Sequence, residues 1–390
     1  MNKAELIQLL EREGQELLAQ LDYSTKLDIV KTISKLRAQG HDPALIANAL
    51  TQAKLRKRAE AKFGEFAQRM FFTEDALEQA SRLQVAALHA NRFKQAGVTQ
   101  IADLGCGIGA ESLAFASLDL KVNAYEIDEV TSAIAAYNLA IFENVEVNNE
   151  DVTKLNLKEH QALFFDPARR NSKARLFNPQ DFSPNFDWVI EQAKQKPSGI
   201  KLGPGHPHNQ IPEEAEAQWV SVEGDLVELS LWFNETKRQE VKRSALLITK
   251  DGKHELKTNE KEEPAPTGEI GQFIHEPDNA VIRSHLINLL AEQTNTHTID
   301  PNIAYLTGNE NITSPWLKSY KIEQVLPFDR KQLKAYIKQN DIGTLEIKKR
   351  GTDITPEALR KELAPKGKNK ATLIVTRIGD AHKAIVATGE

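Results

Sequence analysis

The sequence predicts an α/β protein built around a doubly wound sheet with an antiparallel edge, preceded by a helical domain and followed by a small α/β module. Three observations predict it. Apolar residues recur at helical spacing through residues 1–95, short apolar runs alternate with helical segments through 96–258, and a second β-rich pattern fills 311–390. Alternating strands and helices are typical of parallel sheets covered on both faces. A length of 390 residues allows two or three domains.

The N-terminal domain is expected to be all helical. Leucines follow a helical stripe in residues 4–21, and residues 25–40 repeat that pattern. Pro43 is placed to open a third helix, and Thr73 or Glu74 is placed to cap a fourth.

The central domain alternates strands and helices. Five short β-prone runs come first, and two longer β-rich runs that contain Gly-Asp and Asp-Gly turns come after them. The hairpin-like pair at the end predicts the antiparallel edge. The five short runs are residues 99–105, 121–127, 145–151, 162–166 and 197–203, and the longer runs are residues 218–233 and 243–256.

The rest of the chain divides after residues 259–269, which are charged and rich in proline. Together with a helix predicted over 278–295, they make residues 259–310 a linker and helical connection. Residues 311–390 then predict a compact β-α-β-α-β-β module. From Glu310 to the end sixteen Lys and Arg oppose ten Asp and Glu, so this part is basic although the whole chain has a net charge of −5.

Composition excludes several classes of protein. The negative net charge argues against a generic coat for nucleic acid. Cys106 is the single cysteine, so an internal disulfide is impossible. With no secretory segment and no apolar run of membrane-spanning length, we expect a cytoplasmic protein without a membrane partner. His206 and His208 lack an obvious third ligand, and we expect no metal site.

A glycine-rich loop comes after the first strand of the central domain and precedes a helix. Gly105, Gly107 and Gly109 let the backbone turn tightly and let a ligand approach closely. The pattern also fits a permissive dinucleotide-binding loop, with Ala110 in the place of the last glycine.

Acidic residues near this loop favour S-adenosylmethionine over a dinucleotide. Asp103 lies two residues before the first glycine, where a dinucleotide site needs an apolar residue and where a carboxylate suits an ammonium group. Glu126, at the end of the second strand, can accept hydrogen bonds from both ribose hydroxyls. Asp151, after the third strand, is placed to accept from the adenine amino group, and Ile127 completes the predicted cofactor-binding set. In the alternative interpretation, the glycines only form a turn and the acids only cap surface elements.

Residues 98–166 resemble the cofactor half of a class I methyltransferase. The stretches KRAEAKFGEFAQRMFFTEDALEQAS and ADLGCGIGAESLAFA are similar to the trimethylguanosine synthase-like RNA methyltransferases. The chain resembles more closely the bacterial methyltransferases that carry a C-terminal THUMP-like domain. Near the end of the chain, the stretches LEIKKRG, TPEALRKEL and ATLIVTR resemble that THUMP-like domain. The resemblance implies a Rossmann-like methyltransferase sheet, S-adenosyl-L-methionine as cofactor and RNA as the substrate class.

The stretch FFDPARR ends the fourth strand with an acid, a proline and two arginines. In the resembling amino methyltransferases an acid or Asn here orients the target amine for in-line transfer, a role that Asp166 and Pro167 match. Arg169 stands where those enzymes have an aromatic residue. It can stack on a base or, together with Arg170, bind phosphate. Alternatively, both arginines only form ion pairs with nearby acids such as Asp181 or Asp187.

Two further segments supply candidates for substrate binding. Phe72 and Thr73 lie where the resembling cap enzymes cover their substrate, and an aromatic ring there can stack on a base or pack among helices. His206 and Asn209 lie in the loop after the fifth strand, at the carboxyl edge where such sheets bind ligands.

These residues predict an S-adenosylmethionine-dependent methyltransferase that modifies an amine, a ring nitrogen or a hydroxyl of an RNA nucleotide. Methylation at C5 of a pyrimidine is excluded because it needs a cysteine nucleophile, and Cys106 lies inside the glycine loop. The alternatives are methylation of a protein or a small molecule, and a non-catalytic RNA-binding protein with a vestigial cofactor site.

Overall fold

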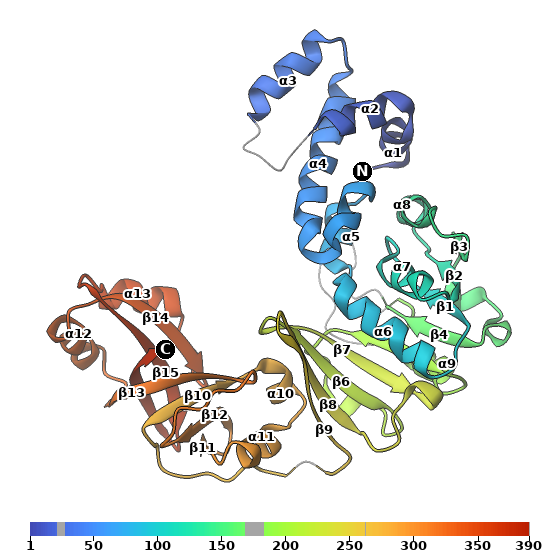
Figure 1. The fold of residues 1–390 in the computed structure, drawn as a ribbon. Coiled ribbons are helices and arrows are strands. Elements are labelled where there is room, and N and C mark those ends of the chain that lie inside the picture. The colour runs from blue at the N-terminus through green and yellow to red at the C-terminus, as the bar shows by residue number, and fades with distance from the viewer. Residues whose placement is uncertain (22–27, 168–182, 262, 390) are drawn as a thin grey trace. The chain divides into compact units, whose positions relative to one another are not determined.

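A computed structural model describes most of the chain and divides into two compact units (Figure 1). Within the described residues, no helix combines the length and the apolar composition needed to cross a bilayer. The structure describes residues 1–21, 28–167, 183–261 and 263–389. The first unit comprises residues 1–202, 212–215 and 231–237, and the second comprises 203–211, 216–230 and 238–390.

Within residues 1–21 and 28–99, six α-helices precede the first strand. The predicted N-terminal helix is interrupted at Glu11, whose backbone is extended with ψ 161°, so two short helices replace one. Asp42 caps the third predicted helix by accepting from the Leu45 N–H at 2.9 Å, and Pro43 occupies its first turn as expected. The helices are α1 Lys3–Leu10, α2 Arg12–Gln20, α3 Ile29–Ala38, α4 Pro43–Phe63, α5 Glu74–Gln79 and α6 Leu83–Gln95.

A nine-stranded sheet has the order β3-β2-β1-β4-β5-β7-β6-β8-β9. The strands β1 to β5 pair in parallel, and the order reverses between β1 and β4. In doubly wound sheets ligands bind beyond the carboxyl ends of the strands at such a reversal. The strands are β1 Gln100–Leu104, β2 Lys121–Tyr125, β3 Val145–Asn148, β4 Ala162–Phe165, β5 Ser198–Leu202, β6 Glu216–Val222, β7 Asp225–Phe233, β8 Arg243–Thr249 and β9 Gly252–Thr258.

The antiparallel edge is confirmed. The strands β8 and β9 pair in opposite directions across the Asp-Gly turn, with Leu247 opposite His254. The next pair inward is parallel, because β6 and β8 run in the same direction, with Val220 opposite Leu246.

One hydrophobic core joins the N-terminal helices to the strands β1, β2 and β4. Phe93 of α6 packs edge-on against Phe115 of α7, with ring centroids 5.6 Å apart, and Phe115 packs against Phe164 of β4 at 5.5 Å. Leucines of α1 and α2 belong to the same buried cluster. The predicted boundary after residue 95 therefore does not separate two cores. Three helices accompany the strands: α7 Ala110–Ser117, α8 Glu129–Leu139 and α9 Phe186–Ala193.

The second sheet corrects the prediction that residues 259–310 are a linker and helical connection. Three strands from this segment join the C-terminal strands in the order β11-β12-β10-β13-β16-β15-β14. The helix predicted over 278–295 is divided at His285, where φ is +56°. The elements from this segment are β10 Phe273–Pro277, α10 Asn279–Arg283, α11 Ile287–Gln293, β11 His297–Asp300 and β12 Ile303–Gly308.

The β-α-β-α-β-β module predicted at the C-terminus is present. Leu333 and Ile337 of one helix and Leu359 and Leu363 of the other are buried against one face of the sheet. The elements are β13 Leu317–Pro327, α12 Arg330–Gln339, β14 Ile342–Arg350, α13 Pro356–Leu363, β15 Asn369–Ile378 and β16 Ala381–Gly389.

Candidate active site

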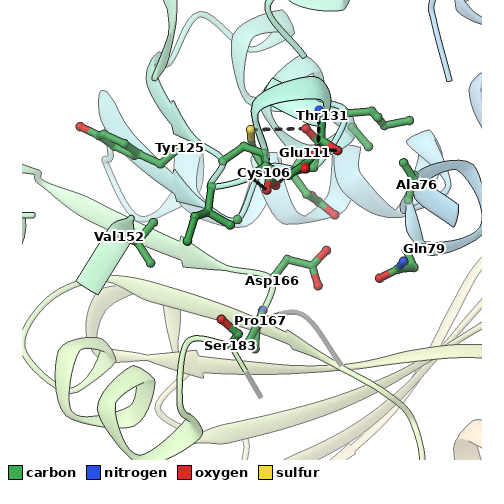
Figure 2. Close-up of a pocket in the computed structure, with 18 of the residues that line it drawn as sticks. Ala76, Gln79, Cys106, Glu111, Tyr125, Thr131, Val152, Asp166, Pro167 and Ser183 are labelled. Carbon is green, nitrogen blue, oxygen red and sulfur yellow. Dashed lines mark hydrogen bonds between the residues drawn. The ribbon is translucent and has the colours of Figure 1, made fainter. Parts of the chain in front are cut away.

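A cavity of about 530 Å³ lies in the first unit, beyond the carboxyl ends of β1, β2 and β4 (Figure 2). The helix α5 supplies part of its wall, including Ala76 and Gln79. Most of the residues predicted for the cofactor and the acceptor meet here. Those that line it are Thr73, Gly105, Gly107, Glu126, Ile127, Asp151, Asp166 and Pro167.

The glycine loop lies close to the end of β4, so the residues predicted for the methyl donor are near those predicted for the acceptor. The three glycines at 105, 107 and 109 have φ of +92°, +55° and +90°. A Cβ on Gly105 would lie 2.9 Å from the carbonyl oxygen of Asp166, so only glycine lets the loop approach the end of β4 this closely. Gly109 does not line the cavity. It begins α7, and a Cβ there would lie 2.8 Å from Leu139.

Glu126 supports the loop and faces the cavity. Its carboxylate accepts from the Gly107 N–H at 3.1 Å and from the Asp128 N–H at 2.9 Å. Burial raises the pKa of this carboxyl, although both hydrogen bonds oppose the shift. Each oxygen can accept a further hydrogen bond, so the group can still receive ribose hydroxyls.

Two other predicted cofactor residues lie further along the wall. The side chain of Ile127 is 65% exposed and gives the cavity an apolar surface. Asp151 accepts from the hydroxyl of Thr153 at 2.7 Å and from its N–H at 3.0 Å, and these hydrogen bonds lower the pKa of Asp151.

Asp103 lies behind the cavity rather than on its surface. It is fully buried, and the hydroxyl of Ser112 donates to its Oδ2 at 2.6 Å. Burial raises the pKa of Asp103 to about 8. Its direct contact with an ammonium group therefore stays a prediction, because the residues that line the cavity do not include it.

Asp166 is held by a lysine that sequence analysis missed. The Nζ of Lys201 lies 2.7 Å from Oδ2 of Asp166 and also donates to the carbonyl of Gln79 at 3.3 Å. Lys201 is a cation within β5, a strand whose residues are all buried. The register pairs Phe165 of β4 with Ile200 of β5, so Asp166 and Lys201, the residues that follow them, lie side by side. The sequence carried one signal for this residue: Lys201 is a charged side chain inside the strand predicted at residues 197–203.

Comparison with known proteins identifies the fold and both ends of the chain. Residues 317–389 match the family described as THUMP domain-like, and residues 3–59 match a domain of unknown function, DUF8688. A crystal structure from Porphyromonas gingivalis W83, assigned to the methyltransferases, has a TM-score of 0.71 at 18% identity and covers 90% of this chain and 92% of its own. Together with the sequence relatives described next, this identifies the chain as a class I S-adenosylmethionine-dependent methyltransferase with a C-terminal THUMP-like domain. Methyltransferases of this class use S-adenosylmethionine as methyl donor.

Two relatives resemble this methyltransferase in sequence. A Mycobacterium tuberculosis protein, named an uncharacterized S-adenosylmethionine-dependent methyltransferase, is 29% identical over 334 residues, which are 83% of this chain and 91% of the relative. Ribosomal RNA small subunit methyltransferase A of Streptococcus sanguinis is 35% identical over 96 residues, which are 25% of this chain and 32% of the relative.

The residues of the cavity fit such a donor. Three buried atoms beside the glycine loop have no hydrogen-bond partner among the described residues: Ser81 Oγ, Asp103 Oδ1 and Glu111 Oε1. Ser81 and Glu111 line the cavity. Unsatisfied acidic oxygens suit the ammonium group of the methionine end, and the acceptors of Glu126 suit ribose.

Of the remaining predicted residues, those that the structure describes do not line this cavity. Phe72 is fully buried and packs against Phe63 at 5.6 Å between ring centroids, so its ring belongs to the helical core. His206 is buried and Asn209 is exposed, both in the second unit, and neither lines the cavity. Arg169 and Arg170 lie outside the described residues. Within the described ranges no group of three or more His, Cys, Asp or Glu is placed to hold a metal.

Proposed function

We propose that this methyltransferase transfers a methyl group to an amine, a ring nitrogen or a hydroxyl of an RNA nucleotide. The observation that carries the proposal is that Asp166 and Pro167 line the same cavity as Gly105, Gly107 and Glu126. An acceptor group held at Asp166 would therefore lie within reach of a donor held at the loop.

Each residue has a role that its position permits. Glu126 binds the ribose, Ile127 packs on the flat adenine ring, and Asp151 accepts from the adenine amino group. The backbone of Gly105 and Gly107 leaves room for the donor, which supplies the electrophilic methyl group. In this proposal Ser81 also faces the methionine end.

The acceptor side depends on Asp166. Its carboxylate, fixed by Lys201 at 2.7 Å, accepts a hydrogen bond from the target group and directs its lone pair toward the methyl. The acceptor loses its proton after transfer, and the same carboxylate is placed to receive it. Arg169 and Arg170, directly after Pro167, are proposed to hold the base or its phosphate.

Two features support RNA as the substrate class. The THUMP-like module carries an exposed basic stripe on α12, where Arg330, Lys334 and Lys338 recur four residues apart, beside the buried stripe of Leu333 and Ile337. The Streptococcus sanguinis relative is named for ribosomal RNA.

Methylation at C5 of a pyrimidine is not supported. Burial raises the pKa of the Cys106 thiol, which is the single cysteine and sits in the glycine loop, so no thiolate faces an acceptor base. The acceptor should be a group that is nucleophilic without covalent activation.

The test uses total RNA from cells that lack the gene, together with isotopically labelled S-adenosylmethionine. We expect the wild-type protein to label one RNA nucleoside, identified by mass spectrometry, and RNA from cells that retain the gene to accept little label. Asp166→Ala should lower transfer by about 100-fold through loss of positioning. Label that appears in cell protein or in small molecules, and not in RNA, would contradict the proposed substrate.

A further inference from the structure

A buried carboxylate–imidazole pair lies beside the glycine loop, apart from the residues assigned to ribose, adenine and acceptor. Glu111, the second residue of α7, accepts from the Nδ1–H of His89 on α6 at 3.0 Å through its Oε2. Both side chains are almost wholly buried, with 2% of His89 and 4% of Glu111 exposed. The imidazole packs against Phe164 at 5.3 Å and Trp232 at 5.5 Å between ring centroids. The carboxylate is therefore fixed in one orientation.

The second oxygen of this carboxylate is unsatisfied. No described residue donates to Oε1 of Glu111, although its exposed area is close to zero. Leaving a buried acceptor unpaired lowers stability, so such groups in native structures are usually completed by a ligand or water. Glu111 lines the cavity whereas Asp103 does not, and Figure 2 shows Glu111 on the same cavity as Asp166.

The surrounding charges favour a cation at this point. Asp103 interacts electrostatically with Glu111, Asp166 and Lys201, so three acids and one lysine share this end of the site. Lys201 is paired with Asp166 at 2.7 Å. Among the described residues His89 is the ion-pair partner of Glu111, and a ligand ammonium would complement the second oxygen of this carboxylate.

We propose that Glu111, positioned by His89, is the carboxylate that binds the ammonium group at the methionine end of the methyl donor. Asp103 does not line the cavity, and it accepts a hydrogen bond from the hydroxyl of Ser112, the residue that follows Glu111. In this way it supports the same end of the site. The inference rests on the proposed function, because it names a contact of the same donor. In the competing interpretation, the pair only joins α6 to α7.

Binding of two ligands to the full-length chain separates these interpretations. S-adenosylhomocysteine carries the ammonium group, and 5′-methylthioadenosine has the same adenosine without the amino acid. By calorimetric titration, we expect Glu111→Gln to weaken S-adenosylhomocysteine by about tenfold or more, since a hydrogen bond to a charged group is lost. Binding of 5′-methylthioadenosine should change by less than about twofold, and that ligand also reports that the variant is folded. Glu126→Ala is the matched control, and should weaken both ligands.

The role of His89 has its own test. His89→Asn keeps an N–H donor at the position of Nδ1 for Glu111, and His89→Leu removes it at similar size. We expect the asparagine variant to retain more of the preference for S-adenosylhomocysteine over 5′-methylthioadenosine than the leucine variant does. Equal preference in the two variants would overturn the positioning role.

The outcomes also distinguish this inference from the proposed function. Wild-type binding of S-adenosylhomocysteine, with an equal affinity in Glu111→Gln, would overturn the Glu111 contact alone. Equal weakening of both ligands in Glu111→Gln would assign the pair to packing and overturn it as well. A wild-type protein that binds neither ligand would overturn the proposed function together with this inference.

Discussion

The pair of Lys201 and Asp166 makes the sharpest prediction about catalysis. Lys201→Met removes the ammonium and keeps the unbranched stem in a strand position that is 6% exposed. The carboxylate then loses a charged partner at 2.7 Å and the link to Gln79 on α5. We expect it to rotate away from the orientation that serves the acceptor.

The magnitude depends on the burial of the two partners. A hydrogen bond to a charged group contributes about 1.5–3 kcal/mol. The side chain of Asp166 is 27% exposed, so water can replace part of the lost interaction, and the lower half of that range applies. If the loss falls on the transition state, turnover drops by roughly 10- to 50-fold. Affinity for S-adenosylhomocysteine should change little, because the variant leaves Glu126 and the glycine loop intact.

The assay measures initial rates of methyl transfer to RNA from cells that lack the gene, beside the thermal midpoint of each variant. Lys194→Met is the control, because Lys194 forms a similar contact with Glu214 at 3.0 Å but both side chains are more than 40% exposed. That surface pair should contribute at most about 1 kcal/mol and leave turnover unchanged. Wild-type turnover in Lys201→Met would refute the positioning of Asp166 by Lys201.

Three further predictions concern binding and stability. Gly105→Ala should weaken S-adenosylhomocysteine strongly, since its Cβ would lie 2.9 Å from the Asp166 carbonyl and φ is +92°; calorimetry measures this. Burial raises the pKa of Asp103 from 3.8 to about 8. Between these values the folded protein retains a proton that the unfolded chain releases. The free energy of unfolding should therefore fall as pH rises from about 4 to 8, by up to about 1.4 kcal/mol per pH unit. Asp103→Asn should flatten that decline in urea unfolding of the ligand-free protein, and an unchanged slope would contradict it. Arg238→Leu removes the guanidinium 2.6 Å from the buried Glu216, and should lower the unfolding free energy toward the lower end of about 3–5 kcal/mol, because Arg238 is 30% exposed; a wild-type urea midpoint would contradict it.

Local patterns in the sequence predicted the sheet because its signals lie close together in the chain. The glycine loop comes directly after a buried strand and opens a helix, and that context alone indicates the crossover from β1 to α7. The acids at the ends of β2 and β4 could be placed on one edge for the same reason, since parallel strands end at the same side.

Long-range contacts could not be predicted in this way. Lys201 contacts Asp166 only because β5 pairs with β4. The sequence of a strand does not determine which other strand it pairs with. The partnership of His89 with Glu111 joins two helices across 22 positions of the chain. Phe72 was predicted to face the substrate, because it precedes the cavity residue Thr73, but its ring is fully buried. Its N–H and carbonyl bind the side chain of Gln52, a contact 20 positions away in the chain that turns the ring inward.

The prediction for the C-terminal segment failed for a different physical reason. Residues 273–277, 297–300 and 303–308 are short and carry polar residues between apolar ones, so each is weak as an isolated strand. They are stable as neighbours in one sheet, where β10 pairs with both β12 and β13. The proline-rich stretch before them was correctly expected to lack regular structure over most of its length, but the composition of a loop carries no information about the strands on its C-terminal side.

The residues proposed for the methyl donor and for the acceptor approach each other closely through their backbones. The backbone of Asp166 lies so close to Gly105 that an added Cβ would meet its carbonyl at 2.9 Å, while the Asp166 side chain is tied to β5 through Lys201. A shift of the Asp166 backbone would therefore disturb the glycine loop, whereas rotation of its side chain alone would not. Because a displacement of about 1 Å can lower the rate of a positioned reaction by about 100-fold, strand register between β1, β4 and β5 sets the reaction geometry more than any flexible side chain does. A site built on this register explains why a glycine and a buried lysine, neither of which takes part in the chemistry, are placed beside Asp166.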